Sequence, residues 1–241
     1  MKYSGSLFIA LAIIITSIIF RDAWIKGKKG KQTISVTGLA SKDFTSDLVV
    51  WRGGFSRTSM NTQEAFNNLK KDAELIKNYL LAKGVKENEI VFSSITSTKQ
   101  YDRVKVSEDN YKQVYTGTML VQEVQIESKE VNKIESISRE VTELLDKGIE
   151  LNSMPPNYFY TKLSDLKIEM LAAATKDGHL RADKIAENAD AKIGNLSNAE
   201  MGIFQITGQN STEDYSWGGA FNTSSKNKTA SITVKLNFDI K

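Results

Sequence analysis

The sequence predicts an α+β fold with a ferredoxin-like β-α-β-β-α-β core, in which two helices pack on one face of an antiparallel sheet. Alternating apolar and polar residues predict four strands, at 43–57, 89–102, 111–128 and 151–163. Apolar residues at helical spacing predict two intervening helices, at 61–83 and 129–147. A long alanine-rich helix and C-terminal strands extend this core.

The folded region opens with two strands. Residues 33–39 read TISVTGL and alternate as a strand does, and residues 43–57 form the second strand. The pair Gly53–Gly54 within it predicts a bulge or a close backbone approach. The remainder of a phosphate-binding glycine motif is missing, so we expect no cofactor at this pair.

The first helix has clear start and stop signals. Asn61 or Thr62 can cap its beginning, and Gly84 follows its end. Its apolar positions are Ala65, Phe66, Leu69, Ala73, Ile76 and Leu80. After the strand at 89–102 we expect a polar loop at 103–110, followed by the long strand at 111–128.

The second half of the chain continues in the same way. The helix at 129–147 ends at Gly148, and the strand at 151–163 is interrupted early by Pro155 and Pro156. The remaining segments are a helix at 164–193, a strand at 198–207, a polar loop at 208–228 and a strand at 230–240.

The helix at 164–193 carries a face of small side chains. On a helical wheel this face holds Leu171, Ala174, Gly178, Ala182, Ile185, Ala189 and Ile193. A glycine inside a helix lowers helix stability by about 1 kcal/mol relative to alanine. Close packing of a neighbouring element against Gly178 must offset this loss. We expect Gly178, Ala182 and Ala189 to form a close-packing surface. His179, the chain's one histidine, falls at its border.

The residues available for catalysis are few. Cysteine is absent and histidine occurs once, which excludes disulfides, thiolate sites and two-histidine zinc motifs. Ser164 and Lys167 match S-x-x-K, but the companion motifs are missing, so Ser164 is interpreted as a helix cap. We therefore expect no enzyme, and we predict no catalytic, cofactor-binding or metal-binding residue.

Three aromatic residues, Tyr215, Trp217 and Phe221, lie in the loop rich in Gly, Ser and Asn. Large apolar groups are unexpected in such a loop. They either fold back onto the core of their own chain or contact another subunit or a ligand, as exposed aromatic residues commonly do. We regard them as candidate interface residues.

The charge of the chain is concentrated at its N-terminus. The formal net charge is +3, but residues 1–31 hold six of the 32 basic residues and one of the 29 acidic ones. The rest of the chain has two more acidic than basic residues. This distribution does not support a nucleic-acid partner.

Residues 7–20, LFIALAIIITSIIF, predict a segment that enters a membrane. We favour an uncleaved signal anchor, with a cleaved signal peptide or a buried core helix as alternatives. The basic flank GKKGK follows the apolar run, which by itself favours a cytoplasmic C-terminus. We divide the chain into this segment (1–31) and one domain (32–241), the latter with two subdomains, 43–163 and 164–241, the second joined by strand 33–39.

Several features together resemble a known family. They are the opening ISVTG-A (Ile34 to Gly38, then Ala40), the pattern around Gly54, the phrase KGVKENEI (83–90), and Tyr115–Gly117 opening a long strand. With the alanine-rich helix and the terminal strand, residues 33–241 resemble the SIMPL-domain proteins, the YggE-like group of bacterial extracytoplasmic proteins. The resemblance implies an α+β fold, export or membrane anchoring, ring-like or channel-like oligomers in some members, stress-related roles, and no established reaction.

The leading hypothesis is a non-enzymatic protein of the cell envelope that is tethered to the membrane through residues 7–20 and associates with copies of itself. The export side of this hypothesis rests on the resemblance. An extracytoplasmic ligand-binding module that uses the loop at 208–228 is the alternative, as is a periplasmic or secreted protein after signal cleavage. An enzyme is the least favoured reading.

Overall fold

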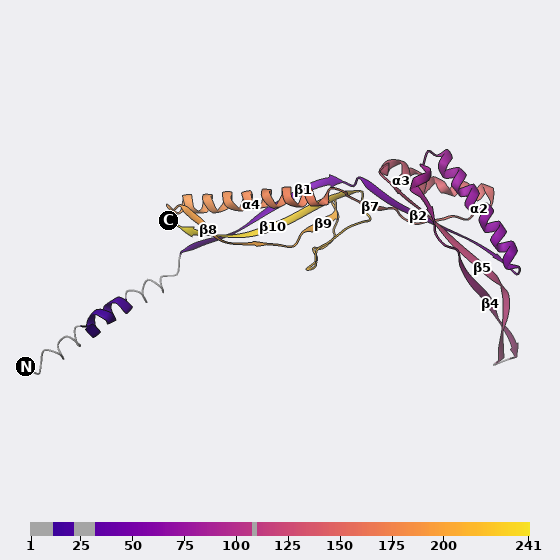
Figure 1. Ribbon diagram of the computed structural model, residues 1–241, viewed down its shortest axis with the longest axis horizontal. Coiled ribbons are helices and arrows are strands. Elements are labelled where there is room, and N and C mark those ends of the chain that lie inside the picture. Colours follow the sequence, from indigo (N-terminus) through magenta and orange to yellow (C-terminus); the bar gives the residue numbers. More distant parts are fainter. Residues whose placement is uncertain (1–11, 22–31, 108–109) are drawn as a thin grey trace, which may run out of the picture. The chain divides into compact units, whose positions relative to one another are not determined.

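A computed structural model describes residues 12–21, 32–107 and 110–241 (Figure 1). Contacts divide the described chain into two compact units. The first holds the residues up to Ala40 with Leu171–Gly202 and Ile232–Lys241, and the second holds Ser41–Met170 and Ile203–Ser231. Helices and antiparallel sheets are both present, so the predicted α+β class is confirmed.

The second unit is built on one antiparallel sheet. Its strands are β2 (Leu48–Ser59), β3 (Ile90–Phe92), β4 (Thr96–Ser107), β5 (Asn110–Ser128), β6 (Asn152–Ser153) and β7 (Asn157–Phe159). They are ordered β3-β5-β2-β6, while β4 also pairs with β5 and β7 with β2. Strands β3 and β6 thus flank a central pair formed by β5 and β2, which is the order of strands in a ferredoxin-like sheet.

Two helices cover one face of this sheet, α2 (Thr62–Ala82) and α3 (Val131–Glu140) (Figure 1). The side chain of Asn61 caps α2 by accepting a hydrogen bond from the backbone N–H of Gln63 at 2.9 Å. The core between helices and sheet is apolar. Its fully buried members include Val49, Trp51, Leu69, Ile76, Leu80, Val124, Ile126, Ile134 and Leu144.

Two details of this unit differ from the sequence prediction. The expected loop at 103–110 is wrong, because β4 and β5 pair out to Ser107 and Asn110. The run Arg-Val-Lys-Val alternates, and its β-branched residues favour a strand. Helix α3 ends at Glu140 and continues to Gly148 as the 3₁₀ helix η2 (Val141–Lys147).

The glycine pair Gly53–Gly54 does not form a bulge. Both residues stay in register with β5. Gly53 instead allows a close approach, because a Cβ there would lie 3.1 Å from the Trp51 ring and from Leu151. Gly54 has open space beside it, with nothing within 4 Å of the position of a Cβ.

The other sheet combines strands from the two ends of the chain. These are β1 (Thr33–Thr45), β8 (Ile193–Met201), β9 (Gln205–Gly208) and β10 (Asn227–Ile240), in the order β1-β10-β8, with β9 also paired to β10. Helix α4 (Leu163–Asn188) lies alongside β1 and β10 (Figure 1). In the first unit, Val36, Ala174, Ala182, Leu236 and Phe238 form part of the buried core.

Gly178 on α4 faces Gly38 on β1. A Cβ on Gly38 would lie 2.0 Å from the Ala174 carbonyl oxygen and 2.5 Å from the Gly178 nitrogen. The N–H of Leu39 next to it donates to the Asp177 carboxylate at 2.9 Å. This hydrogen bond, followed by that from Arg181, lowers the pKa of Asp177. Helix and strand therefore meet at backbone contact.

The small-residue face of α4 follows a different row from the predicted one. The buried positions in the first unit are Ala174, Gly178, Ala182 and Ala186, at a constant spacing of four. A row of this spacing winds slowly around the helix, so it leaves Ile185 exposed.

Ala189, predicted as part of the close-packing surface, is exposed and lies beyond the helix, which ends at Asn188 and not at 193. Ala191 donates its N–H to the Ala186 carbonyl, and Asp190 takes φ 53° and donates to Glu187. This is the hydrogen-bond pattern of a Schellman ending, with aspartate at the left-handed position that glycine commonly fills. The prediction failed because the sequence offers no glycine there.

Residues 12–21 form a helix with an apolar surface. Six of its large side chains are exposed, Ile13, Ile14, Ile15, Ile18, Ile19 and Phe20. In the part of the chain that the structure describes, no helix is both long enough and apolar enough to cross a membrane. Residues 7–11 of the predicted membrane segment lie outside the described residues.

Candidate functional site

The aromatic residues singled out by the sequence lie on a loop that joins β9 to β10, residues 209–226. We call it the aromatic loop. Trp217 is 96% exposed, and Tyr215 and Phe221 are 69% and 56% exposed. Of the two alternatives left open by the sequence, folding back onto the core is therefore wrong for Trp217, which has almost no contact with its own chain.

A buried glutamine fixes the tip of the aromatic loop. Gln205 lies on β9, and its amide nitrogen donates to the Ser216 carbonyl at 2.8 Å. Its amide oxygen accepts from the N–H of Ala220 at 2.7 Å and from that of Ser216 at 3.3 Å. One side chain thus holds both sides of the turn that carries Trp217, which tightens further at Gly219, where φ is +94°.

A second set of hydrogen bonds closes the base of the loop. The Glu213 carboxylate accepts from the backbone N–H of Gly208 at 2.9 Å and from the amide nitrogen of Asn222. Asn222 is buried and also accepts the N–H of Ser225 at 2.8 Å. Because buried side chains tie down residues on both sides of Trp217, its exposure is a fixed presentation and not a consequence of missing contacts.

Lys228 is buried beneath the loop. Only 2% of the residue is exposed, and its Nζ donates to the Tyr158 carbonyl oxygen at 2.5 Å. Burial lowers the pKa of Lys228 to about 8, and the negative charge of Glu213 opposes this lowering. The lysine links β10 to β7, and its positive charge interacts with the Glu213 carboxylate.

The stability of the protein should therefore depend on pH through Lys228. Between about pH 8 and 10.5 the unfolded chain still holds the proton that folded Lys228 has released, so folding becomes more favourable as pH rises. Each unit of difference in pKa contributes about 1.4 kcal/mol. Relative to Lys228→Met, wild-type protein should gain free energy of unfolding across this window.

Urea denaturation at pH 7, 9 and 10.5 measures this gain. Lys235→Met, on the exposed side of the same strand, controls for the loss of a lysine. If the difference in free energy of unfolding between wild type and Lys228→Met stays constant across the three pH values, Lys228 does not titrate with a lowered pKa in the folded protein, and the prediction is wrong.

The anchoring residues were not predicted from the sequence, although one signal was present. Lys228 stands two residues before Ala230, in phase with the inward-facing Ile232 and Val234 of β10. A lysine at an inward position of an alternating strand indicates a buried charge. Gln205 and Asn222 gave no such signal, because their roles depend on which strands meet.

The other residues considered in the sequence make different contacts. Lys167 has its Nζ 5.6 Å from the centre of the Phe204 ring, a cation–π contact. His179 is exposed, and its ring packs edge-on against Phe238 at 5.5 Å. Within residues 12–21, 32–107 and 110–241, no three His, Cys, Asp or Glu side chains are grouped as metal ligands would be.

Comparison with known protein families matches residues 34–238 to SIMPL, described as a protein of unknown function (DUF541). The chain belongs to the SIMPL family. The predicted family is thereby confirmed. The SIMPL region begins in β1 and ends in β10, so it includes the aromatic loop and its buried anchors. A search among curated proteins found no match to the chain.

Proposed function

We propose that this SIMPL protein is a non-enzymatic component of the cell envelope that is tethered to the membrane and associates with copies of itself through the aromatic loop. The observation that carries the proposal is Trp217, exposed over 96% of its surface on a loop held by buried hydrogen bonds. Exposing a tryptophan to water is unfavourable, and tryptophan is one of the residue types enriched among the residues that contribute most to binding at interfaces. A fixed loop also loses little conformational entropy on binding.

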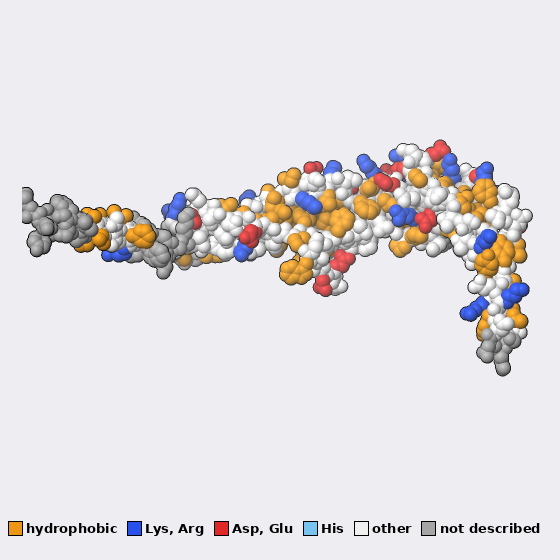
Figure 2. Space-filling view, turned by 60° about the horizontal axis from the view of Figure 1, so that its bottom comes forward, with side chains coloured by type: hydrophobic (Ala, Val, Ile, Leu, Met, Phe, Trp, Pro, Cys, Tyr) orange, Lys and Arg blue, Asp and Glu red, His pale blue; other side chains and the backbone are white. Residues whose placement is uncertain are grey.

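The tether is supported by the helix at 12–21, whose isoleucines and phenylalanine are exposed. An apolar surface on every side of a helix is stabilised by lipid rather than by water. Figure 2 shows this helix as a largely hydrophobic surface. Lys2 and the basic residues between 21 and 31 flank the apolar run in the sequence, as expected next to anionic lipid headgroups.

The interface is tested by Trp217→Ala in the full chain, extracted in a mild detergent and weighed by light scattering. We expect wild-type protein to form a defined oligomer and Trp217→Ala to shift to smaller species, with the unfolding transition unchanged. Met60→Ala serves as a control, because Met60 is also highly exposed but lies outside the loop. An oligomer of unchanged mass in Trp217→Ala would contradict the proposed interface.

The location is tested separately with protease added to intact spheroplasts. An extracytoplasmic domain should be digested from outside, since residues 209–218 of the aromatic loop are exposed. Survival of the domain under conditions that digest a known extracytoplasmic protein would place it on the cytoplasmic side and overturn the envelope part of the proposal.

A further inference from the structure

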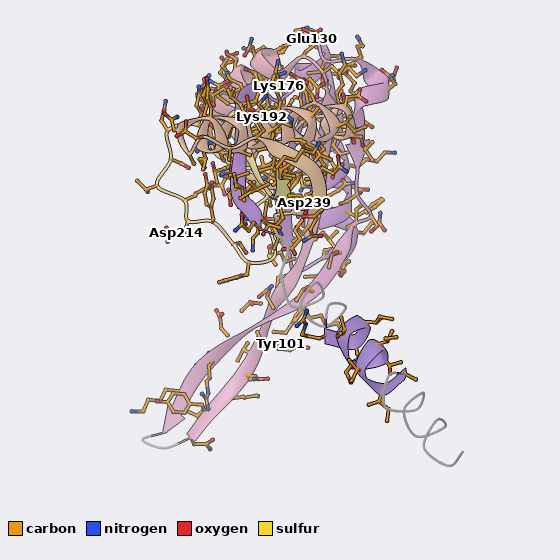
Figure 3. The ribbon with its side chains drawn as sticks, turned by 90° about the vertical axis from the view of Figure 1, so that its left-hand side faces the viewer. Tyr101, Glu130, Lys176, Lys192, Asp214 and Asp239 are labelled. Carbon is orange, nitrogen blue, oxygen red and sulfur yellow. The ribbon has the colours of Figure 1, made fainter. Side chains whose placement is uncertain are left out.

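The hairpin of β4 and β5 extends beyond the sheet of its own unit. β5 pairs with β2 only as far as Thr118, opposite Ser59, whereas β4 and β5 remain paired out to Ser107 and Asn110. We call residues 101–107 and 110–115 the arm, which at about 3.4 Å per residue is roughly 24 Å long. Its side chains stand out from both faces of the ribbon (Figure 3). An isolated two-stranded ribbon is marginally stable in water, so we expect it to have a partner.

One face of the arm combines aromatic rings with positive charge. Tyr101 pairs with Tyr115 across the strands, their ring centres 5.7 Å apart. On the same face the Arg103 guanidinium lies 5.0 Å from the centre of the Tyr111 ring, and Lys105 is directly opposite Tyr111. The acidic residue of the described arm, Asp102, belongs to the other face. The aromatic face is thus exposed and cationic.

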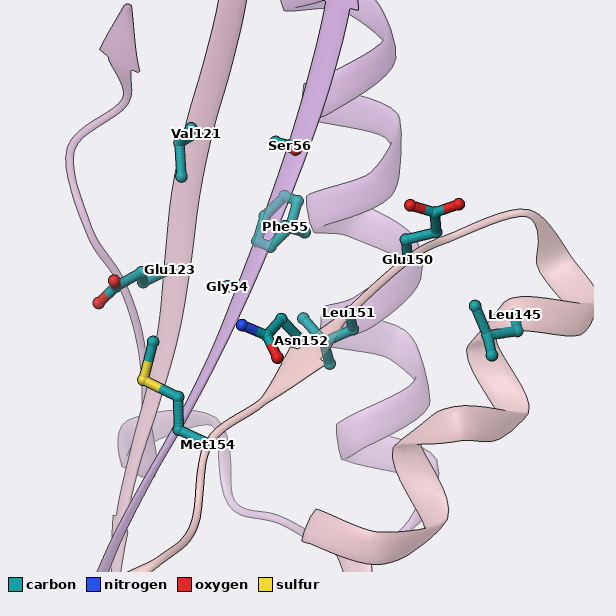
Figure 4. A pocket seen from close by; sticks show the side chains of 10 residues that line it. All are labelled: Gly54, Phe55, Ser56, Val121, Glu123, Leu145, Glu150, Leu151, Asn152 and Met154. Atoms are coloured by element: carbon teal, nitrogen blue, oxygen red, sulfur yellow. The ribbon is translucent and has the colours of Figure 1, made fainter.

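The same unit contains a groove of opposite character beside β2, with a volume of about 420 Å³ (Figure 4). Its lining includes apolar side chains, two glutamates and no basic residue. In Figure 4 the carboxylates of Glu123 and Glu150 lie on opposite sides, with Phe55 and Leu151 between them. Gly54 keeps the groove open, since nothing lies within 4 Å of where its Cβ would be.

The groove also borders an open strand edge. β6 pairs with β2 only at Gly53 and Gly54, and no described strand pairs with this edge of β2 from Phe55 to Ser59. An extended strand brought to such an edge can add backbone hydrogen bonds to contacts between side chains. The groove therefore suits a strand that carries aromatic and positively charged groups.

We propose that the arm of one copy of this chain docks into the Glu123–Glu150 groove of a second copy. Arg103 and Lys105 would face the two carboxylates, and Tyr111 would cover the apolar floor. Direct pairing of two arms through their aromatic faces would instead bring like charges together, which is unfavourable. The proposal rests on the self-association proposed above and identifies a second contact surface for it.

The two surfaces in this contact are different, so each copy can offer its arm to one neighbour and its groove to another. Such a head-to-tail contact repeats until it closes into a ring or continues as a filament. This property separates the proposal from a simple arm exchange, which would stop at two copies.

The chain contains no cysteine, so single cysteines can report the contact without background. Two full-length chains with different tags are co-expressed, one carrying Gln113→Cys on the aromatic face of the arm and the other Ser56→Cys in the groove. Mild oxidation should join the two chains, because a disulfide requires Cα atoms within about 7 Å. Lys70→Cys, exposed on α2, is the matched control and should not cross-link to either.

Variants of the two surfaces complete the test. Reversing the arm charges (Arg103→Glu with Lys105→Glu) should lower the cross-link yield about tenfold, and so should reversing the groove charges (Glu123→Lys with Glu150→Lys). Combining the chain that has the reversed arm with the chain that has the reversed groove should restore the yield. Filling the groove with Gly54→Met should also block it. Gln113→Cys chains that cross-link only to one another would indicate arm pairing and overturn this inference.

These experiments distinguish a failure of the arm–groove contact from a failure of the proposed aromatic-loop interface. A monomeric wild-type chain would overturn both proposals. An oligomer whose mass and cross-links are indifferent to the charge reversals would overturn the arm–groove contact alone, while cross-linking of arm to groove in Trp217→Ala chains of unchanged mass would overturn the aromatic-loop interface alone.

Discussion

Gly38→Ala is expected to lower the free energy of unfolding by about 3 kcal/mol or more. The added methyl group would lie 2.0 Å from the Ala174 carbonyl oxygen and 2.5 Å from the Gly178 nitrogen. Both are backbone atoms, so rotation of a side chain cannot make room. Helix α4 and strand β1 would have to separate, and the Leu39–Asp177 hydrogen bond beside them would lengthen.

Two control variants isolate this effect. Gly54→Ala also adds a methyl group to a strand glycine, but in open space, so it should change stability by less than about 1 kcal/mol. Gly178→Ala meets mainly the end of the Leu236 side chain at 2.8 Å, and it gains helix propensity, so its cost should be much smaller than that of Gly38→Ala.

Urea denaturation of the full chain followed by circular dichroism gives the comparison. Equal midpoints for Gly38→Ala and Gly54→Ala would show that helix and strand are not in backbone contact in solution. His179→Ala should have little effect, because the histidine is exposed and packs only at the edge of Phe238.

Arg57→Met is expected to destabilise the second unit by about 3 kcal/mol. Asp72 on α2 is nearly buried, and the Arg57 guanidinium binds both of its oxygens, at 2.5 and 3.0 Å. The same guanidinium donates to the Gly148 carbonyl oxygen at 2.8 Å. The hydrogen bond to Asp72 raises the pKa of Arg57. Removing the arginine leaves a buried carboxylate and a carbonyl without their partner.

A double-mutant cycle distinguishes loss of the partner from loss of packing. Asp72→Leu added to Arg57→Met should recover more than half of the lost stability, because the uncompensated charge is gone. The exposed pair Lys77–Glu87 provides the contrast, and Lys77→Met should cost much less stability than Arg57→Met, because solvent screens an exposed ion pair. A double variant as unstable as the sum of its parts would mean that the two side chains act independently.

The strands and helices of the second unit were largely predictable because their signals are local. Asn61 and Gly84 bracket α2, and the alternation within β2 and β5 identifies which residues face the helices. The length of the hairpin was not predicted, because the charged residues at 103–110 were interpreted as a loop although Val104 and Val106 alternate with them as in a strand. The pairing of Gly38 with Gly178 joins positions 140 residues apart, which no local pattern reports.

The candidate site was predictable in part for the same reason. Trp217 stood out because a tryptophan in a polar loop conflicts with its surroundings. Its anchors did not, because Gln205 becomes informative only once β9 lies next to the returning chain. The composition of the loop could identify the exposed aromatic side chain. The hydrogen bonds that fix the loop could not be predicted, because they depend on contacts between segments distant in the sequence.

In the aromatic loop, the residues that fix the backbone differ from the residue that forms the exposed tip, and this has an evolutionary consequence. Gln205, Glu213 and Asn222 hold the backbone of the loop through hydrogen bonds, while the exposed ring of Trp217 contributes little to folding. We therefore expect mutations at the exposed tip to be nearly neutral for folding and to spread or disappear according to what the loop contacts. Related chains could acquire different binding preferences by exchanging these side chains, while Gln205, Glu213 and Asn222 would be retained by selection for a folded protein.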